Sequence, residues 1–254
     1  MMSFMAEPQV WTSDLLEAPH DVSDKAGRVR RMFNAIAPRY ERVNSLFSAG
    51  RDRYWRRKAV AQTRVRADDD VLDVACGTGD FARAFRAAGP RSVVGCDFAH
   101  EMLLRAANRK ERRRLPGGDR WIEADALQLS FRDGSFSIVS CAFGVRNFAD
   151  LQAGLLEMHR VLRPGGRVVI LEFTRPGNAL MRSLYEFYAN RVMPFAAAWV
   201  SRDASGAYRY LPRSVVSFLD APRMIAELHR AGFERATATP LTFGIVTVYL
   251  GFRG

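Results

Sequence analysis

The residues of this chain that could do chemistry gather around a short glycine-rich turn. The apolar run Val71 to Val74 is interrupted by Asp73, and Gly77-Thr78-Gly79 follows it, with Asp80 directly after. This pattern predicts a buried parallel strand, a tight turn and a helix that begins near Asp80. Two residues without a Cβ let the backbone bend sharply and let a ligand lie against it. In open α/β sheets, ligands bind at such carboxyl ends of strands.

The charges around the turn indicate which ligand it would take. The turn also satisfies the dinucleotide pattern G-x-G-x-x-A, which is a weak signal alone. Asp73 and Asp80 would repel a pyrophosphate and attract a cation. S-adenosylmethionine carries a sulfonium and an ammonium and no phosphate, so it suits these charges better than a nicotinamide dinucleotide does. Asp97 ends the next apolar run, at the usual place for an acid that accepts both ribose hydroxyls. We therefore expect a methyltransferase, with an ordinary ligand-free turn as the alternative.

Length and composition set the broad class. A chain of 254 residues with 48% hydrophobic content can form one large α/β domain with appendages. No apolar run approaches the roughly 18 to 20 residues of a membrane span, and the first residues do not resemble a secretory signal. Three cysteines, without zinc spacing, favour a reducing cytoplasm and no metal site.

The net charge of +11 is concentrated near the N-terminus. Residues 25–66 contain thirteen Lys and Arg against two acids, and a second basic run covers 105–114. One interpretation is a set of solvated helix faces. The others are a nucleic-acid footprint or attraction to an anionic membrane surface.

Hydrophobic periodicity predicts two parts. Residues 1–66 form an N-terminal helical lid or extension, with helices over about 22–36 and 51–63, and residues 67–254 form the main domain. In that domain, strands are expected at about 70–75, 92–96, 120–123, 136–143, 167–173, 234–240 and 245–252, with helices at about 80–88, 99–113, 151–162 and 222–231. The alternation predicts an α/β fold with a doubly wound, mostly parallel, seven-stranded sheet of the Rossmann-like type. The aromatic residues of an insertion at about 175–220 suit either helical core packing or an apolar wall for a greasy substrate.

Several segments together resemble one family. They are Ile36-Ala37-Pro38-Arg39-Tyr40, Phe143-Gly144-Val145-Arg146-Asn147 and Tyr208-Arg209-Tyr210-Leu211. With them, the chain resembles the ubiquinone/menaquinone biosynthesis C-methyltransferases from about residue 24 to 252. The Gly-Thr-Gly turn and the Pro-Gly-Gly at 164–166 are shared by many class I methyltransferases and say little about substrate. Among the departures, Ala142 stands where the family often has a hydroxyl residue, and Arg202 and Arg213 replace residues that are usually small or acidic.

The resemblance implies S-adenosylmethionine as the cofactor and a set of contacts to it. Thr78 would meet the methionine part, Asp97 the ribose, and Asp125 with the Ala126 amide the adenine. The full set of expected contacts is Asp73, Gly77, Thr78, Gly79, Asp97, Met102, Asp125, Ala126 and Ala142.

The resemblance also implies methylation of a ring carbon of a polyprenylated hydroquinone. Arg146 is expected to stabilise the developing phenolate charge, and Tyr40 to relay the proton or orient the hydroxyl. His159 is a possible general base but suits a structural role better, because it lies in the middle of a predicted helix away from the crevice. Alignment and exclusion of water would then matter more than covalent help.

The favoured substrate is demethylmenaquinol, with the ubiquinone precursor (2-polyprenyl-6-methoxy-1,4-benzoquinol) or another lipid-like molecule as alternatives. Its tail implies a cytoplasmic enzyme in peripheral contact with the inner face of the cell membrane through the basic N-terminal region. Nucleic acid is disfavoured as a partner, because residues 142–145 lack the Asn/Asp-Pro-Pro-aromatic tetrad of nucleobase methyltransferases. A non-catalytic scaffold would be expected to lose Asp97 or Arg146, and both are present. A homodimer is compatible with the sequence.

Overall fold

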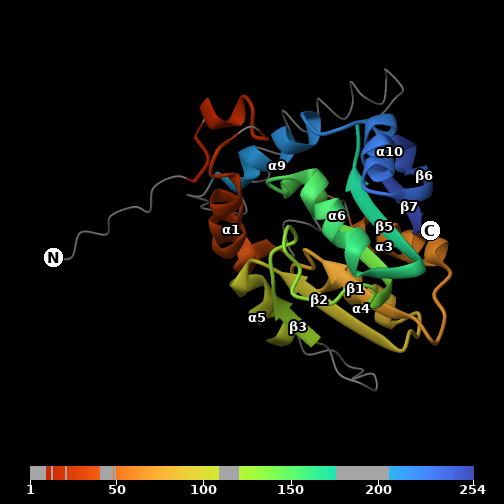
Figure 1. Ribbon diagram of the computed structural model, residues 1–254. Helices are drawn as coiled ribbons and strands as arrows, with labels where there is room; N and C mark the ends of the chain where they lie inside the picture. The colour runs from red at the N-terminus through yellow and green to blue at the C-terminus, as the bar shows by residue number, and fades with distance from the viewer. Residues whose placement is uncertain are drawn as a thin grey trace.

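The computed structural model describes residues 10–12, 14–20, 22–40, 48, 50–108, 120–175 and 206–254. At its centre is a seven-stranded sheet with the strand order β3-β2-β1-β4-β5-β7-β6 (Figure 1). The strands are β1 Asp70–Val74, β2 Ser92–Asp97, β3 Arg120–Glu123, β4 Phe136–Ala142, β5 Leu162–Phe173, β6 Phe233–Leu241 and β7 Val246–Arg253. The first five pair in parallel, whereas β7 is antiparallel to β5 and β6. The predicted doubly wound, mostly parallel sheet is confirmed.

Helices follow most of the strands, as the sequence pattern predicts. The α-helices are α1 Lys25–Ile36, α3 Asp52–Thr63, α4 Asp80–Arg86, α5 His100–Asn108, α6 Leu151–Val161, α9 Ala207–Val216 and α10 Ala221–Arg230. Short 3-10 turns are η1 Asp14–Leu16, η2 Ala37–Arg39, η3 Val145–Asn147 and η5 Thr242–Gly244. The predicted end of the α5 segment at 113 lies outside the described residues, as does most of the 175–220 insertion. Within that insertion, α9 is helical despite an internal proline at 212.

One strand boundary differs from the prediction. β5 begins at Leu162 rather than at 167, because Leu162 already pairs with Phe136 on β4. The Pro-Gly-Gly segment then shifts the register, and regular pairing resumes between Ile138 and Arg167. The turn read from the sequence is therefore a bulge within a longer strand.

The core has two layers, one on each face of the sheet. On one face, α3 and α4 place Trp55, Ala59 and Phe85 against apolar side chains of the central strands. On the other face, α6 and α10 bury residues such as Leu155, and Leu228 belongs to the same cluster. Because the central strands are covered on both sides, they are almost continuously apolar, and a buried carboxylate such as Asp73 stands out against them.

The N-terminal helices make separate contacts. α1 packs against α5 and α9, and these elements lie together at one side of the sheet, while α10, β6 and β7 lie at the other (Figure 1). α3 packs instead against α4, β5 and β7. The division at residues 66 and 67, and the lid role of the first part, remain predictions.

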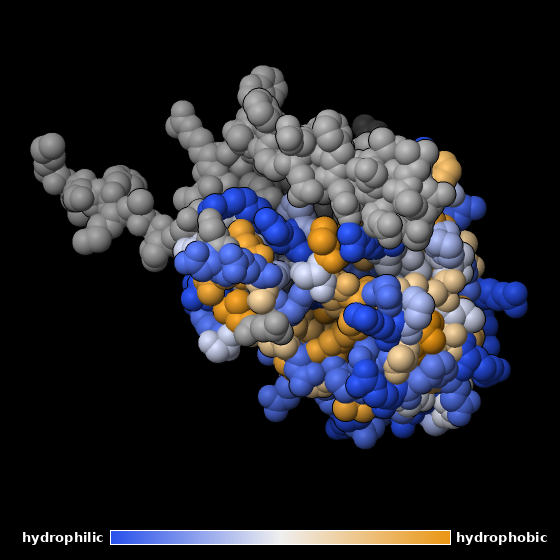
Figure 2. Space-filling model, turned by 90° about the horizontal axis from the view of Figure 1, so that it is seen from above, coloured by the Kyte–Doolittle hydropathy of each residue, from blue (hydrophilic) through white to orange (hydrophobic). Residues whose placement is uncertain are grey.

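In the part of the chain that the structure describes, no helix is long and apolar enough to span a membrane. On the face seen in Figure 2, hydrophobic residues gather toward the middle and hydrophilic residues occupy most of the margin.

Candidate active site

The glycine-rich turn connects β1 to α4 through left-handed backbone. Ala75, Gly77 and Gly79 have φ angles of 51°, 54° and 82°, a region that disfavours side chains with a Cβ. Gly77 lines both cavities described below. Gly79 does not line them, because its Cα faces the Trp121 ring, where a Cβ would lie 2.3 Å from a ring carbon. The first glycine thus opens the turn to a ligand, whereas the second allows close packing of β3 against the turn.

Asp73 is fully buried in β1, and its carboxyl group is hydrogen-bonded to α4, which follows the turn, and to the neighbouring strand β4. Its Oδ2 accepts a hydrogen bond from the Ala82 amide at 2.9 Å, and its Oδ1 accepts one from the Ser140 hydroxyl at 2.7 Å. Burial raises the pKa of Asp73 to about 7. The carboxyl group therefore joins β1, β4 and the first turn of α4, and it borders the smaller cavity.

Asp97 ends β2 with both carboxylate oxygens oriented by backbone amides. Oδ2 accepts from Gly77 and Oδ1 from Ala99, each at 2.8 Å. Burial raises the pKa of Asp97 to about 6. Each oxygen keeps a further lone pair, so the group can accept both hydroxyls of a ribose.

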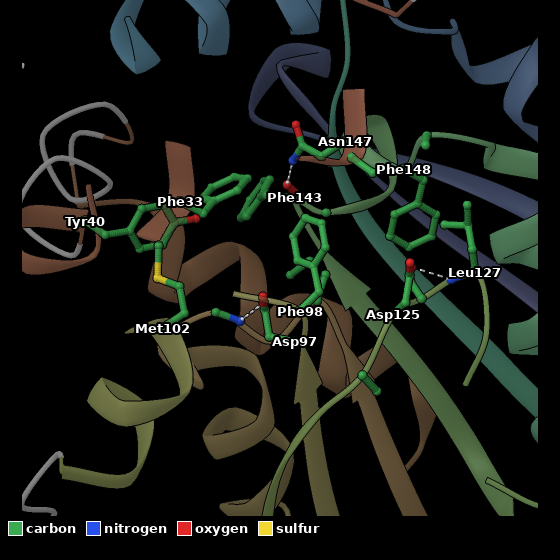
Figure 3. A pocket seen from close by; sticks show the side chains of 18 residues that line it. Phe33, Tyr40, Asp97, Phe98, Met102, Asp125, Leu127, Phe143, Asn147 and Phe148 are labelled. Atoms are coloured by element: carbon green, nitrogen blue, oxygen red, sulfur yellow. Dashed lines mark hydrogen bonds between the residues drawn. The ribbon is translucent and has the colours of Figure 1, made fainter. Parts of the chain in front are cut away.

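A cavity of about 700 Å³, part of it open to solvent, lies beyond the carboxyl ends of β1, β2 and β4. Part of its lining consists of residues expected to meet the cofactor and their neighbours: Asp97, Phe98, Met102, Asp125, Ala126 and Leu127. Much of the remaining lining is aromatic, with one amide: Phe33, Tyr40, Phe143, Asn147 and Phe148. Figure 3 shows Asn147 and Asp97 on opposite sides of this space, with Tyr40 and Met102 to one side and Asp125 and Leu127 to the other.

Asp125 and Ala126, which are predicted to meet the adenine, both line this cavity. Asp125 uses one carboxylate oxygen to accept from the Leu127 amide at 2.9 Å, which leaves acceptor capacity on the exposed carboxylate. Ala142 lies at the end of β4 and lines both cavities, but its methyl group offers no hydrogen bond. Met102 contributes an apolar wall from α5.

A smaller cavity continues under Tyr40 and is lined by Arg56, Asp73, Thr78 and Asp80, among others. Sequence reasoning missed Arg56, because it lies within the basic run of α3. It differs from its neighbours in facing inward, where it donates to Asp52 at 2.6 Å and approaches Asp80 at 4.0 Å. The spacing of Asp52 and Arg56, one helical turn apart, was the available signal. This cavity therefore offers one cation and several acceptors to a zwitterionic ligand.

Arg146 is buried beside the larger cavity but does not line it. Its guanidinium donates to Glu172 Oε1 at 2.6 Å and to the Phe143 carbonyl at 2.7 Å. Nε donates to the Ser214 hydroxyl at 3.3 Å. Glu172 is fully buried in β5, and burial raises its pKa while Arg146 opposes that shift. The predicted catalytic cation thus forms an inner ion pair under the loop that follows β4.

Asn147, the next residue, does face the cavity, and sequence reasoning assigned it no role. Its Nδ2 donates to the Phe143 carbonyl at 3.3 Å, and its Oδ1 accepts from the Tyr210 hydroxyl at 3.0 Å. The Tyr210 ring stacks on Trp11, with ring centroids 4.2 Å apart. Both rings are fully buried, so the N-terminal segment and α9 together hold the orientation of Asn147.

Tyr40 lines both cavities and lies between them. Burial raises its pKa, and the charges of Arg146 and Arg56 oppose this effect. The phenol is therefore protonated at neutral pH and can donate a hydrogen bond. His159 lines neither cavity; its ring packs against Phe233, with centroids 5.1 Å apart, and burial lowers its pKa, in agreement with a structural role.

The donors and acceptors fit S-adenosylmethionine. Asp97 and Asp125 match the hydroxyls and amino group of adenosine, and the apolar lining between them suits a purine. Asp73 and Asp80 border the smaller cavity, where an ammonium or a sulfonium is attracted, and Arg56 supplies a partner for a carboxylate. A pyrophosphate in the same place would be repelled by the carboxylates of Asp73 and Asp80.

Comparison with solved structures agrees with the fold. A SAM-dependent methyltransferase from Aquifex aeolicus superposes with a TM-score of 0.60 at 13% identity, covering 84% of this chain and 98% of that one. A Haemonchus contortus phosphoethanolamine N-methyltransferase, solved with S-adenosylhomocysteine, gives a TM-score of 0.55 at 16% identity, covering 77% and 52%. At these identities the likeness concerns the fold alone.

Relatives found by sequence share a much higher identity with this chain. The chain is 45% identical over 232 residues to a demethylmenaquinone methyltransferase of Deinococcus radiodurans, covering 91% of this chain and 95% of that one. It is also 45% identical to one of Thermus thermophilus, covering 87% and 100%. A ubiquinone/menaquinone biosynthesis C-methyltransferase UbiE of Geotalea daltonii is 40% identical, covering 91% and 98%. A family model matches residues 21–253, and with these relatives it shows that the chain belongs to the ubiE/COQ5 methyltransferase family.

Proposed function

We propose that this enzyme methylates a ring carbon of a polyprenylated hydroquinone, with demethylmenaquinol as its substrate. It belongs to a methyltransferase family, and its methyl donor is S-adenosylmethionine. The observation that carries the proposal is a single cavity that is lined by the carboxylates Asp97 and Asp125 together with aromatic side chains, with Asn147 opposite Asp97 (Figure 3). Relatives named demethylmenaquinone methyltransferase support the choice of substrate.

The cofactor would be held by residues at the ends of β1, β2 and β3 and by one residue of α3. Asp97 accepts the ribose hydroxyls, and Asp125 with the Ala126 amide meets the adenine edge. Arg56 and the Gly77-Thr78 turn hold the methionine part. S-adenosylmethionine supplies the electrophilic methyl group when bound. Gly79 and Asp73 would contribute to cofactor binding indirectly, because they fix the shape of the turn.

The acceptor ring would lie on the other side of the cavity. Phe33 and Phe148 offer flat apolar surfaces to an aromatic ring, while Asn147 offers polar atoms to a ring hydroxyl. Asn147 Oδ1 accepts from Tyr210, and one Nδ2 hydrogen is donated to the Phe143 carbonyl. The second Nδ2 hydrogen is therefore the one available to a hydroquinone oxygen. That orientation suits a substrate oxygen that becomes negative during the reaction.

Carbon methylation requires electron density at the carbon beside a ring hydroxyl. The density rises as that hydroxyl loses its proton, so groups that stabilise the phenolate accelerate the reaction. Arg146 would act from behind the cavity lining, where its guanidinium is paired with Glu172 and donates to the Phe143 carbonyl. Tyr40, kept protonated by burial, would donate a hydrogen bond to the oxygen or orient it. When both substrates fill the cavity, they would displace water that could compete for the methyl group.

Three finer points belong to the same proposal. The ubiquinone precursor is the second candidate substrate, because the UbiE relatives are named for both quinones. The tail of either substrate favours a cytoplasmic enzyme that contacts the inner face of the cell membrane. A homodimer remains an expectation.

Product chemistry tests the proposal. Purified enzyme and S-adenosylmethionine are incubated with a short-prenyl demethylmenaquinol, or with the same molecule oxidised to the quinone. We expect one methyl group to be added to the quinol, and the product to oxidise reversibly to a quinone, because both hydroxyls remain free. A methyl ether, which cannot be oxidised in this way, or equal transfer to the oxidised molecule would refute carbon methylation of a hydroquinone.

A further inference from the structure

One exposed aromatic side chain stands apart from the core and from the cavities. Phe243 is 78% exposed at the tip of η5, the turn between β6 and β7. Thr242, Phe243 and Gly244 have successive φ angles of 46°, 56° and 84°. Such a backbone is unfavourable for a bulky residue with a Cβ, yet a large aromatic side chain stands here in solvent.

The turn is anchored at its base. The Trp55 indole donates to the Thr242 hydroxyl at 2.7 Å, and the Thr174 hydroxyl donates to the Gly244 carbonyl at 2.9 Å. Trp55 itself packs against Phe143 and Phe173, with ring centroids 6.2 Å and 6.0 Å away. Phe143 lines the larger cavity, so the base of the turn adjoins the active site.

A cationic surface lies beside this turn on α3. The exposed residues at the start of the helix and in its first two turns are Arg51, Arg53, Tyr54, Arg57 and Lys58. The one acid of α3, Asp52, is buried against Arg56. Within the described part of the chain, no acid forms an ion pair with any of these exposed cations. We call these five residues and Phe243 the edge surface.

The cations of α1 have different surroundings, although in the sequence α1 and α3 are equally recognisable as basic helices. Lys25 is buried and donates to the carbonyls of Arg146 and Phe148. Arg28 donates to the Val10 carbonyl at 2.7 Å, and Arg31 pairs with Asp24. Among the described residues of α1, Arg30 is the one exposed cation without an ion pair, whereas Arg51 and α3 together present four.

Topology places the edge surface at the same edge of the sheet as the active site. α3 runs back along the sheet before β1, so its first turns lie at the carboxyl ends of the parallel strands. β7 is antiparallel to β5 and begins opposite Phe173, so the turn that precedes it lies at that edge too. A flat partner bound there would face the side of the molecule on which the cavity opens.

We propose that the edge surface docks the enzyme onto an anionic lipid bilayer, with Phe243 inserted at the headgroup level. The proposal rests on the proposed function, which gives the enzyme a substrate with a membrane-embedded tail. Aromatic rings favour the membrane–water interface, and each Lys or Arg near an anionic leaflet strengthens binding by a factor of about five at low salt. A rigid aromatic tip backed by cations with no acid between them is complementary to such a surface.

Vesicle co-sedimentation of the full chain tests the proposal, using vesicles with roughly one third phosphatidylglycerol and, separately, neutral phosphatidylcholine vesicles. We expect binding to the anionic vesicles at low salt, weaker by roughly tenfold or more in Arg53→Ser/Arg57→Ser and weaker by several-fold in Phe243→Ser. The matched control, Arg64→Ser/Arg120→Ser, removes two exposed cations at the opposite edge of the sheet and should bind as the natural chain does.

Methyl transfer to a short-prenyl quinol in detergent, measured in the same variants, separates the two proposals. Unchanged turnover in detergent with reduced turnover on vesicle-embedded quinol supports docking. Absence of vesicle binding in the natural chain, or an equal loss in the control variant, would overturn the docking proposal and leave the methylation result intact. Retention of duplex DNA in place of vesicles, lost in the same α3 variant, would also overturn it.

Discussion

The ion pair between Arg146 and Glu172 allows the proposed catalytic role of Arg146 to be separated from its structural role. Replacing Arg146 by methionine would leave Glu172 fully buried without its cation. Loss of one partner of a buried pair typically destabilises a protein by about 3–5 kcal/mol. A simple loss of activity in such a variant would therefore not distinguish chemistry from unfolding.

The pH dependence of this variant follows from the pKa of Glu172. Burial already raises that pKa, and Arg146 is the largest opposing influence. Without Arg146 the folded-state pKa rises further above its unfolded value, so the folded state binds the additional proton. The free energy of unfolding of Arg146→Met should then fall as pH rises above the ordinary pKa of Glu, 4.5, more steeply than in the natural chain.

The double variant Arg146→Met/Glu172→Gln removes both charges. The glutamine oxygen can still accept from the Phe173 amide, which Glu172 Oε1 does at 2.8 Å. Its stability should return to within about 1 kcal/mol of the natural chain, because neither buried charge remains unpaired. If Arg146 stabilises the phenolate, the kcat of the folded double variant should still be about 100-fold or more below that of the natural chain, with cofactor affinity unchanged.

Urea unfolding at several pH values and steady-state kinetics measure these effects. A single variant as stable as the natural chain at neutral pH would refute the buried-pair reasoning. A stable double variant with full kcat would refute the catalytic role of Arg146.

Three further predictions concern neighbouring residues. Asp97→Asn should raise the cofactor Kd by about 100-fold, because it removes charge-assisted acceptors and sets an amide donor against the backbone amide of Gly77 or Ala99. Calorimetry measures this Kd, and a change below about threefold would contradict the assignment. In the natural chain, cofactor affinity should fall as pH drops below about 6, where Asp97 becomes protonated, and a titration across that range that shows constant affinity would oppose it. Tyr210→Phe leaves Asn147 Oδ1 without its donor, so kcat should fall about tenfold with little change in KM, whereas equal kcat in a folded variant would deny Tyr210 a positioning role.

Much of the fold could be predicted from the sequence, because its signals are local. Alternating apolar strands and helices, with a glycine-rich turn after the first strand, indicate a doubly wound sheet. The meeting of Asp97 and Asp125 in one cavity followed from the same logic. Asp97 and Asp125 each follow a predicted parallel strand, and the carboxyl ends of parallel strands meet at one edge.

The remaining features depend on contacts between distant segments. The direction of the Arg146 side chain is set by Glu172 on the next strand, and the orientation of Asn147 is set by Tyr210. Gly79 could be recognised as a turn residue, but its contact with Trp121 could not. None of these pairings leaves a periodic or compositional signal in one sequence.

The most direct test of the central assignment is methyl transfer from labelled S-adenosylmethionine to demethylmenaquinol and to the demethylated ubiquinol precursor, each offered separately to the purified enzyme. Our account predicts label in demethylmenaquinol, at a kcat/KM at least equal to that for the ubiquinone precursor, and loss of transfer in the folded Arg146→Met/Glu172→Gln variant. Tight cofactor binding without transfer to either quinol would contradict it.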